Sequence, residues 1–166
     1  MSDGTARFNL PMLQPGQAQK EVFHNESLTL IDAAMHPAVE SRGENVPPAT
    51  PIFGASWIIG ASPVGEWLNR AENLACWTEG GWRFIAPVEG MRIWRRDIEL
   101  FSVWTGSAWQ DGVIRAEYVE IEGKTVIRRQ QSAIEDPSGG AIADVEARAV
   151  TASILAVMRA HGLIAT

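Results

Sequence analysis

Residues 52–129 contain eight short runs rich in Trp, Ile, Val and Phe, and this pattern restricts the possible folds more than any other feature of the sequence. The runs are ASWIIG, LACWT, GWRFIAP, GMRIWRR, IELFSVWT, AWQDGVI, AEYVEIEG and KTVIRR. Gly, Pro, Asn or Asp separates many of them at intervals of about 8–12 residues, which is typical of antiparallel strands. The sequence therefore predicts an antiparallel β domain over residues 52–131, arranged as a meander, small barrel or sandwich.

Two tryptophan-bracketed turns, WTEGGW at residues 77–82 and WTGSAW at residues 104–109, occur within this region. Each contains a short Gly-bearing link and is therefore predicted to be a β-hairpin with one Trp on either strand. Two facing indoles form a cross-strand pair worth roughly 0.2–1 kcal/mol. The chain has 7 Trp, enough to fill the core of a small sheet domain, so core packing is the first interpretation of each. Stacking on a sugar is the alternative for the four at the hairpin tips: Trp77, Trp82, Trp104 and Trp109.

A helical segment is predicted on each side of the β domain, which gives an α+β fold. Residues 1–40 contain an apolar arm and a helix over QAQKEVFHNESLTLIDAAM, which ends before Pro37. Apolar side chains recur at helical spacing along one face of this helix: Val22, Leu28, Ile31 and Met35. Residues 41–51 and 132–140 are rich in Pro and Gly and are predicted to be linkers. Residues 141–166 are predicted to form the C-terminal helical region.

The C-terminal helix has clear ends and an apolar seam. Asp144 is a suitable N-cap, Glu146 lies in the first turn, Arg159 lies near the end, and Gly162 is placed to end the helix. The seam has the 3-4-3-4 spacing of a coiled coil and consists of Ala147, Val150, Ile154, Val157 and His161. It fits either packing on the chain's own sheet or association of several copies in a homo-oligomer, with a trimer favoured. Barely three heptads cannot hold chains together alone, so the β domain is expected to share the contact.

The composition excludes several classes of function. A net charge of −6 and a pI of about 5.1 argue against a nucleic-acid binder, which needs a basic surface. No run approaches the ~20 apolar residues of a membrane span, and no secretory signal is recognised. Two local basic clusters are expected on solvated strand faces: Arg92, Arg95 and Arg96, and Arg128 and Arg129.

Few residues indicate catalytic chemistry. The single cysteine, Cys76, is expected to be a buried, inert thiol. The 3 histidines lack metal-ligand spacing and no phosphate-binding loop is present, so neither a metal nor a cofactor is expected. Acids near the tryptophans could serve as a glycosidase pair, although acids near strand ends are usually surface residues: Asp97, Glu99 and Asp111.

Four stretches carry a resemblance across nearly the whole chain: LPMLQPGQAQKEVFHNESLTLIDA, PPATP followed by GASWIIGASPVGEW, WRFIAPVEGMRIW, and RAHGLIA. Together they resemble an uncharacterised family, a domain of unknown function common in prophages, bacteriophages and gene transfer agents of alphaproteobacteria. The family has no established catalytic residues to transfer. The resemblance implies an origin among virion structural genes, especially those of tail-fibre, head-spike and adsorption proteins.

These observations predict a non-enzymatic structural component of a phage-like particle: a tail fibre, head spike or baseplate-associated adsorption protein. Residues 1–40 would attach it to other virion proteins, and the C-terminal helix would lie on the symmetry axis. It would connect a receptor-binding part to the particle or contact host-surface polysaccharide itself. Synthesis in the bacterial cytoplasm would precede its incorporation into the particle. The alternatives are a small polysaccharide-degrading enzyme and a monomeric carbohydrate-binding module.

Overall fold

The computed structural model describes residues 3–14, 16, 20–139 and 144–165. The chain divides into two compact units, Met1–Val113 and Ile114–Thr166. The division falls inside the β domain expected over residues 52–131. Its last two strands, β9 (Val119–Ile121) and β10 (Lys124–Ile127), pair with each other and lie in the second unit. Every residue of both strands is exposed, so this hairpin adds no buried side chain to a core.

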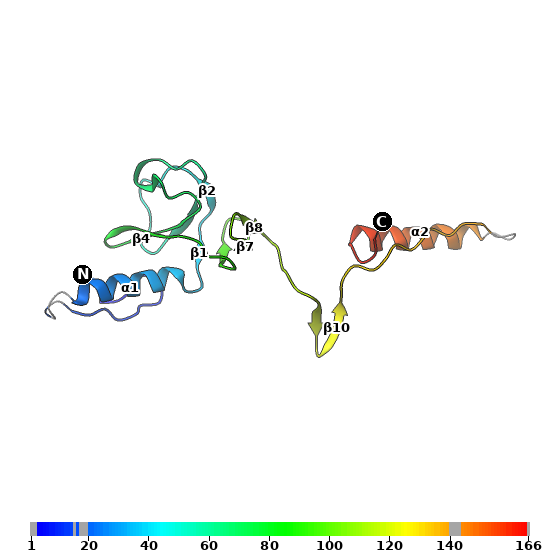
Figure 1. Ribbon diagram of the computed structural model, residues 1–166, viewed down its shortest axis with the longest axis horizontal. Helices are drawn as coiled ribbons and strands as arrows, with labels where there is room; N and C mark the ends of the chain where they lie inside the picture. The colour runs from blue at the N-terminus through cyan, green and yellow to red at the C-terminus, as the bar shows by residue number, and fades with distance from the viewer. Residues whose placement is uncertain (1–2, 15, 17–19, 140–143, 166) are drawn as a thin grey trace. The chain divides into compact units, whose positions relative to one another are not determined.

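The first unit begins with an extended arm and helix α1 (Lys20–Ala34), which run alongside each other (Figure 1). Asp32 is buried and its carboxylate accepts hydrogen bonds from Thr5 Oγ1 at 2.6 Å and from the backbone N–H of Arg7 and Phe8. Nearer the start of the helix, the Asn25 side-chain amide bonds both the N–H and the carbonyl of Leu13. These contacts fix the arm on α1.

The helix expected over residues 17–35 is confirmed from Lys20 onward, whereas residues 17–19 lie outside the described residues. The four residues of its expected apolar face differ in exposure, and Leu28 is half-buried. Val22, Ile31 and Met35 are exposed, while Asp32 and Ala33 are buried. The reason is the arm, because its backbone donors hold the polar Asp32 side of the helix inward.

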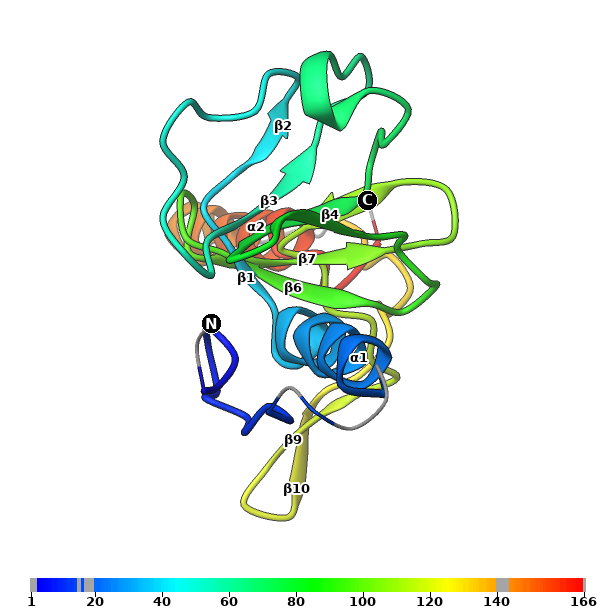
Figure 2. The same cartoon turned by 90° about the vertical axis from the view of Figure 1, so that its left-hand side faces the viewer.

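Two four-stranded sheets make up the rest of the first unit (Figure 2). One has the order β2 (Arg42–Glu44), β3 (Ser56–Ile59), β4 (Leu74–Thr78) and β5 (Gly81–Ile85). The other has the order β1 (Ala38–Val39), β6 (Arg92–Arg95), β7 (Leu100–Trp104) and β8 (Trp109–Asp111). Among the described strands, β1–β6 and β2–β3 are parallel pairs and the other pairings are antiparallel. The predicted α+β class with a mainly antiparallel, Trp-rich β region is confirmed.

The segment after α1 connects the two sheets. Val39 accepts a hydrogen bond from the Arg96 N–H, on the β6 side, and Ser41 accepts one from the Ile58 N–H of β3. Strand β2 therefore lies inside residues 41–51, which were expected to be a linker. This strand has three residues, two of them exposed, so it leaves no alternating apolar pattern in the sequence.

The core of the first unit occupies both faces of the β2–β5 sheet. Ile58 and Leu74 are fully buried on one face, where they pack with Val39, Ile93 and Trp109. Ile59 and Ala75, the next residues along the two strands, point the other way, as alternation along a strand requires. They form a second cluster with Trp67 and Trp82. Trp67 comes from the short 3₁₀ helix η1 (Gly65–Trp67). Burial on both faces explains why β3 and β4 are nearly continuous apolar runs.

The second unit contains the β9–β10 hairpin and helix α2 (Val145–Ala160). The predicted helix ends are confirmed. The Asp144 carboxylate accepts a hydrogen bond from the Ala147 N–H at 2.8 Å, and Gly162 has a φ of 70°. The N–H groups of Gly162 and Leu163 bond the carbonyls of Arg159 and Met158, which is a complete Schellman motif. Neither described helix has the length and apolar content that crossing a membrane requires.

Candidate functional site

The two tryptophan-bracketed turns are hairpins of the same construction, as predicted. Trp77 is the cross-strand partner of Trp82, with ring centroids 5.0 Å apart, and Trp104 is the partner of Trp109 at 5.3 Å. The threonine after the first Trp of each motif explains the rest of the repeat. Thr78 Oγ1 donates to the Gly81 carbonyl at 2.6 Å, and Thr105 Oγ1 donates to the Ala108 carbonyl at 2.9 Å, so each hydroxyl closes its own turn.

One indole of each pair is buried in the core. Trp82 is 9% exposed and makes edge contacts with Trp57 and Trp67, with centroids 5.6 and 5.2 Å away. Trp109 is 5% exposed, and its Nε1 donates to the Glu72 carbonyl at 3.0 Å. The other two, Trp77 and Trp104, are half-buried and keep accessible ring surface. The hairpins therefore leave two of the four expected sugar-stacking residues accessible to a ligand.

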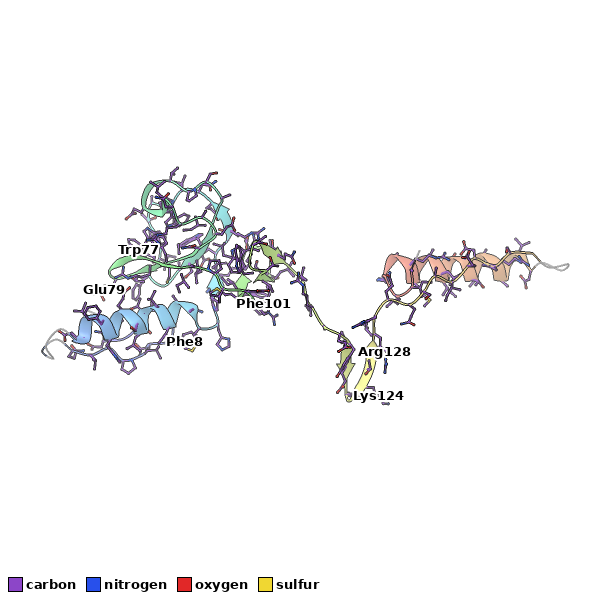
Figure 3. The ribbon with its side chains drawn as sticks, viewed as in Figure 1. Phe8, Trp77, Glu79, Phe101, Lys124 and Arg128 are labelled. Atoms are coloured by element: carbon purple, nitrogen blue, oxygen red, sulfur yellow. The ribbon has the colours of Figure 1, made fainter. Side chains whose placement is uncertain are left out.

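A further aromatic surface, which was not predicted from the sequence, lies on β6 and β7. Trp94 is the cross-strand partner of Phe101, with ring centroids 5.0 Å apart and a T-shaped arrangement. Arg92 lies on the same side of β6, and its Cζ is 4.7 Å from the centre of the Phe101 ring. Phe101 is 43% exposed. Its side chain is labelled in Figure 3. The period-two spacing of Arg92 and Trp94 was the available signal, but the contribution of Phe101 required the strand register.

Two of the three acids considered for glycosidase chemistry, Asp97 and Asp111, are held in an ion-pair network. Arg95, expected on a solvated face, is instead 8% exposed, and its guanidinium contacts Asp97 at 2.5 Å and Asp111 at 2.8 Å. Asp111 also accepts a hydrogen bond from Ser102 Oγ at 2.5 Å. The hydrogen bond from Arg95 lowers the pKa of Asp97, whereas a glycosidase general acid needs a raised pKa. Glu99 lies exposed in the turn between β6 and β7.

The seam predicted on α2 is on the open side of the helix. Val150, Ile154 and Val157 are 59, 55 and 57% exposed, and Ala147 and His161 are exposed as well. Val150, Ile154 and Val157 line a shallow apolar groove together with Ala149, Ser153 and Met158. Apolar side chains on a helix normally face a core. This groove is therefore a departure from ordinary burial in the second unit.

The opposite side of α2 is covered by the chain itself. Leu155 is 6% exposed, and two arginines on its side of the helix bind the preceding segment. Arg148 donates to the carbonyls of Pro137 and Gly139, and Arg159 donates to Asp136 Oδ1 at 2.8 Å and to the Ile134 carbonyl. Part of the linker expected over residues 132–140 thus runs along α2. The second unit covers one side of its helix and leaves the seam uncovered.

Metal-binding and thiol chemistry have little support among the described residues. No group of three or more His, Cys, Asp and Glu side chains there is arranged to hold a metal ion. Cys76 is buried, as expected, and burial raises the pKa of its thiol. A raised pKa disfavours the reactive thiolate.

Residues 24–110 match the model of a family described as a protein of unknown function, DUF2793. The chain belongs to this family. The matched region extends from α1 to β8 and lies within the first unit, so the α2 seam is outside it. No curated protein matches the chain.

Proposed function

We propose that this protein is a non-enzymatic structural component of a phage-like particle, a tail fibre, head spike or baseplate-associated adsorption protein, and that it assembles as a homotrimer through α2. The observation that carries the proposal is the exposed seam of Val150, Ile154 and Val157 on a helix whose other side is already covered. The seam has coiled-coil spacing, and a second copy presents the same surface. The virion setting comes from the motif resemblance described above.

The energetics require α2 to act together with another contact. Full burial of a Val or Ile side chain is worth about 1.5–3 kcal/mol, and these three are each already about half buried. The seam therefore contributes a few kcal/mol per chain, whereas micromolar affinity needs about 8 kcal/mol. We expect the first unit to share the interface.

Residues 1–40 are the part proposed to attach the subunit to other virion proteins. The arm is fixed on α1 by Asp32 and Asn25, which provides a preformed surface. Phe23 on α1 is 80% exposed, and Val22 beside it is exposed as well. Exposed apolar side chains of this size are typical of interaction surfaces when they lie together.

The test of assembly is a pair of charge substitutions on α2. Ile154→Glu places a carboxylate in the seam and is expected to dissociate the oligomer, as measured by light scattering after gel filtration. Ala156→Glu introduces the same charge at an exposed position on a different side of the helix and should leave the mass unchanged. Equal masses for Ile154→Glu and the unmodified protein would remove α2 from the interface.

Contact with cell-surface polysaccharide is the second candidate function, and the Arg92, Trp94 and Phe101 surface favours it. Aromatic faces stack on sugar rings, and the guanidinium can pair with acidic sugars. On a glycan array, Phe101→Ala should abolish a signal that Val88→Ala, at another exposed apolar position, retains. Release of reducing ends that is lost in Asp97→Asn or Asp111→Asn would instead support the enzyme.

A further inference from the structure

The first unit contains a pocket of about 350 Å³ between the N-terminal arm, α1 and the β4–β5 hairpin. The arm contributes Ala6 and Met12, the hairpin contributes Cys76 and its turn, and the remaining apolar lining comes from Val22 and Phe53. Glu79, at the hairpin turn, lies on the side of the hairpin toward α1 (Figure 3). The volume lies within the range of ordinary ligand sites, about 300–1,000 Å³.

The walls of this pocket are held in place by polar contacts. Asp32 and Asn25 fix the arm to α1 through the bonds described above. On the other side, Arg83 Nε contacts Glu26 Oε1 at 2.6 Å, which ties the hairpin to the helix. Arg83 also donates to the Gly80 carbonyl in the turn, at 3.1 Å. The pocket is therefore preformed, and a ligand need not order its walls.

The lining is acidic as well as apolar. Among the described residues, four carboxylates line the pocket, those of Glu21, Glu26, Asp32 and Glu79, together with the guanidinium of Arg83. Glu26 is paired with Arg83, and Asp32 is satisfied by the arm. Glu21 differs, because its Oε2 is buried and has no hydrogen-bond partner in the part of the chain that the structure describes. A buried carboxylate oxygen without a donor is costly, and a cationic donor on a ligand would remove that cost.

We propose that this pocket binds a lysine or arginine side chain presented by a partner protein. The methylene stem of such a side chain would pack on the apolar lining while its charged end reaches Glu21. This combination fits a cationic side chain better than a fully apolar or an anionic ligand. The inference rests on the attachment role proposed for residues 1–40 and is independent of α2.

The test compares two capped tripeptides, Gly-Lys-Gly and Gly-norleucine-Gly, titrated into the full-length protein. Norleucine keeps the aliphatic stem and lacks the charge. The lysine peptide should give saturable amide shifts at Thr29 and Gly80 in NMR spectra. The affinity of the norleucine peptide should be lower by about tenfold or more. Added salt should weaken binding of the lysine peptide, because the attraction is partly electrostatic.

Two substitutions of Glu21 test whether its carboxylate binds the lysine peptide. Glu21→Gln should weaken binding of the lysine peptide about tenfold, and Glu21→Lys should abolish it. Glu66→Gln, on η1 of the same unit, removes an equal charge elsewhere and should change nothing. Unchanged near-UV circular dichroism confirms that each variant is folded.

Several results would overturn the proposal: equal binding of both peptides, no shift with either, or binding that is indifferent to Glu21→Gln. Cadaverine that binds while the lysine peptide does not would show a small-amine site instead. The oligomer mass is measured separately, so failure of the pocket and failure of α2 assembly give different results.

Discussion

The two units of this chain use their apolar residues in opposite ways. The first unit buries them in two clusters on either face of one sheet, and its buried Asp32 and Arg95 are hydrogen-bonded. In the second unit, Leu155 and Ile164 are the buried apolar side chains among the described residues, while α2 and the β9–β10 hairpin expose Val and Ile side chains. From this difference we propose that the second unit buries its exposed Val and Ile side chains against a partner chain.

The helices make the same contrast on a smaller scale. Helix α1 is held by its polar side, through Asp32 and Asn25, against an arm from its own unit. Helix α2 is held on one side by Arg148 and Arg159 and keeps its apolar seam open. Small units with little core generally depend on additional contacts for stability.

The largest expected effect is the loss of a core indole in the first unit. Trp67 is fully buried against Trp57 and Trp82, and Trp67→Ala should lower the free energy of unfolding by about 3–5 kcal/mol. Urea unfolding followed by near-UV circular dichroism measures this loss. A loss below about 1 kcal/mol would contradict the assigned core.

Release of the arm is the next largest effect. Asp32→Ala leaves the Thr5 hydroxyl and the Arg7 and Phe8 N–H groups without their acceptor and should cost about 1–3 kcal/mol. Hydrogen exchange at residues 5–10 should accelerate strongly, while exchange in β4 stays slow. Protection of the arm that is unchanged in this variant would show that other contacts hold it.

In the second unit, a substitution at the C-terminal end of α2 should have a smaller effect on stability. Gly162 has a φ of 70°, and Gly162→Ala should destabilise the end of α2 by about 1 kcal/mol. Thermal melting followed at 222 nm should show the change, with near-UV signals of the first unit unaffected. A shift of both signals together would indicate that the two units unfold as one.

The smallest effect concerns acid stability of the first unit. The folded-state pKa of Asp97 is lowered by its hydrogen bond from Arg95, so its contribution is present above the ordinary Asp pKa and is lost as the pH falls through the lowered value. Asp97 is partly exposed, so the contribution is below about 1 kcal/mol. Asp97→Asn should lower the unfolding free energy at about pH 6 and make little difference at about pH 2. An equal loss of unfolding free energy at both pH values would show that the lowered pKa of Asp97 is not the cause.

Local chemistry made much of the fold predictable. Both Trp hairpins, the Asp144 cap and the Gly162 terminus depend on residues a few positions apart. Features formed by distant residues were not predictable. The Arg95–Asp111 pair and the Trp94–Phe101 surface follow from the register of β6, β7 and β8, and the buried side of α1 follows from the arm. The spacing of the α2 seam was readable, but its openness depends on what covers the helix.

The most direct test of the central claim is the mass of the full-length protein in solution, measured by sedimentation equilibrium at micromolar concentration. The chain mass is 18.1 kDa, and we expect a discrete species of three times that mass, with α2 at its axis. A single species of 18.1 kDa across the concentration range would contradict trimer assembly through α2.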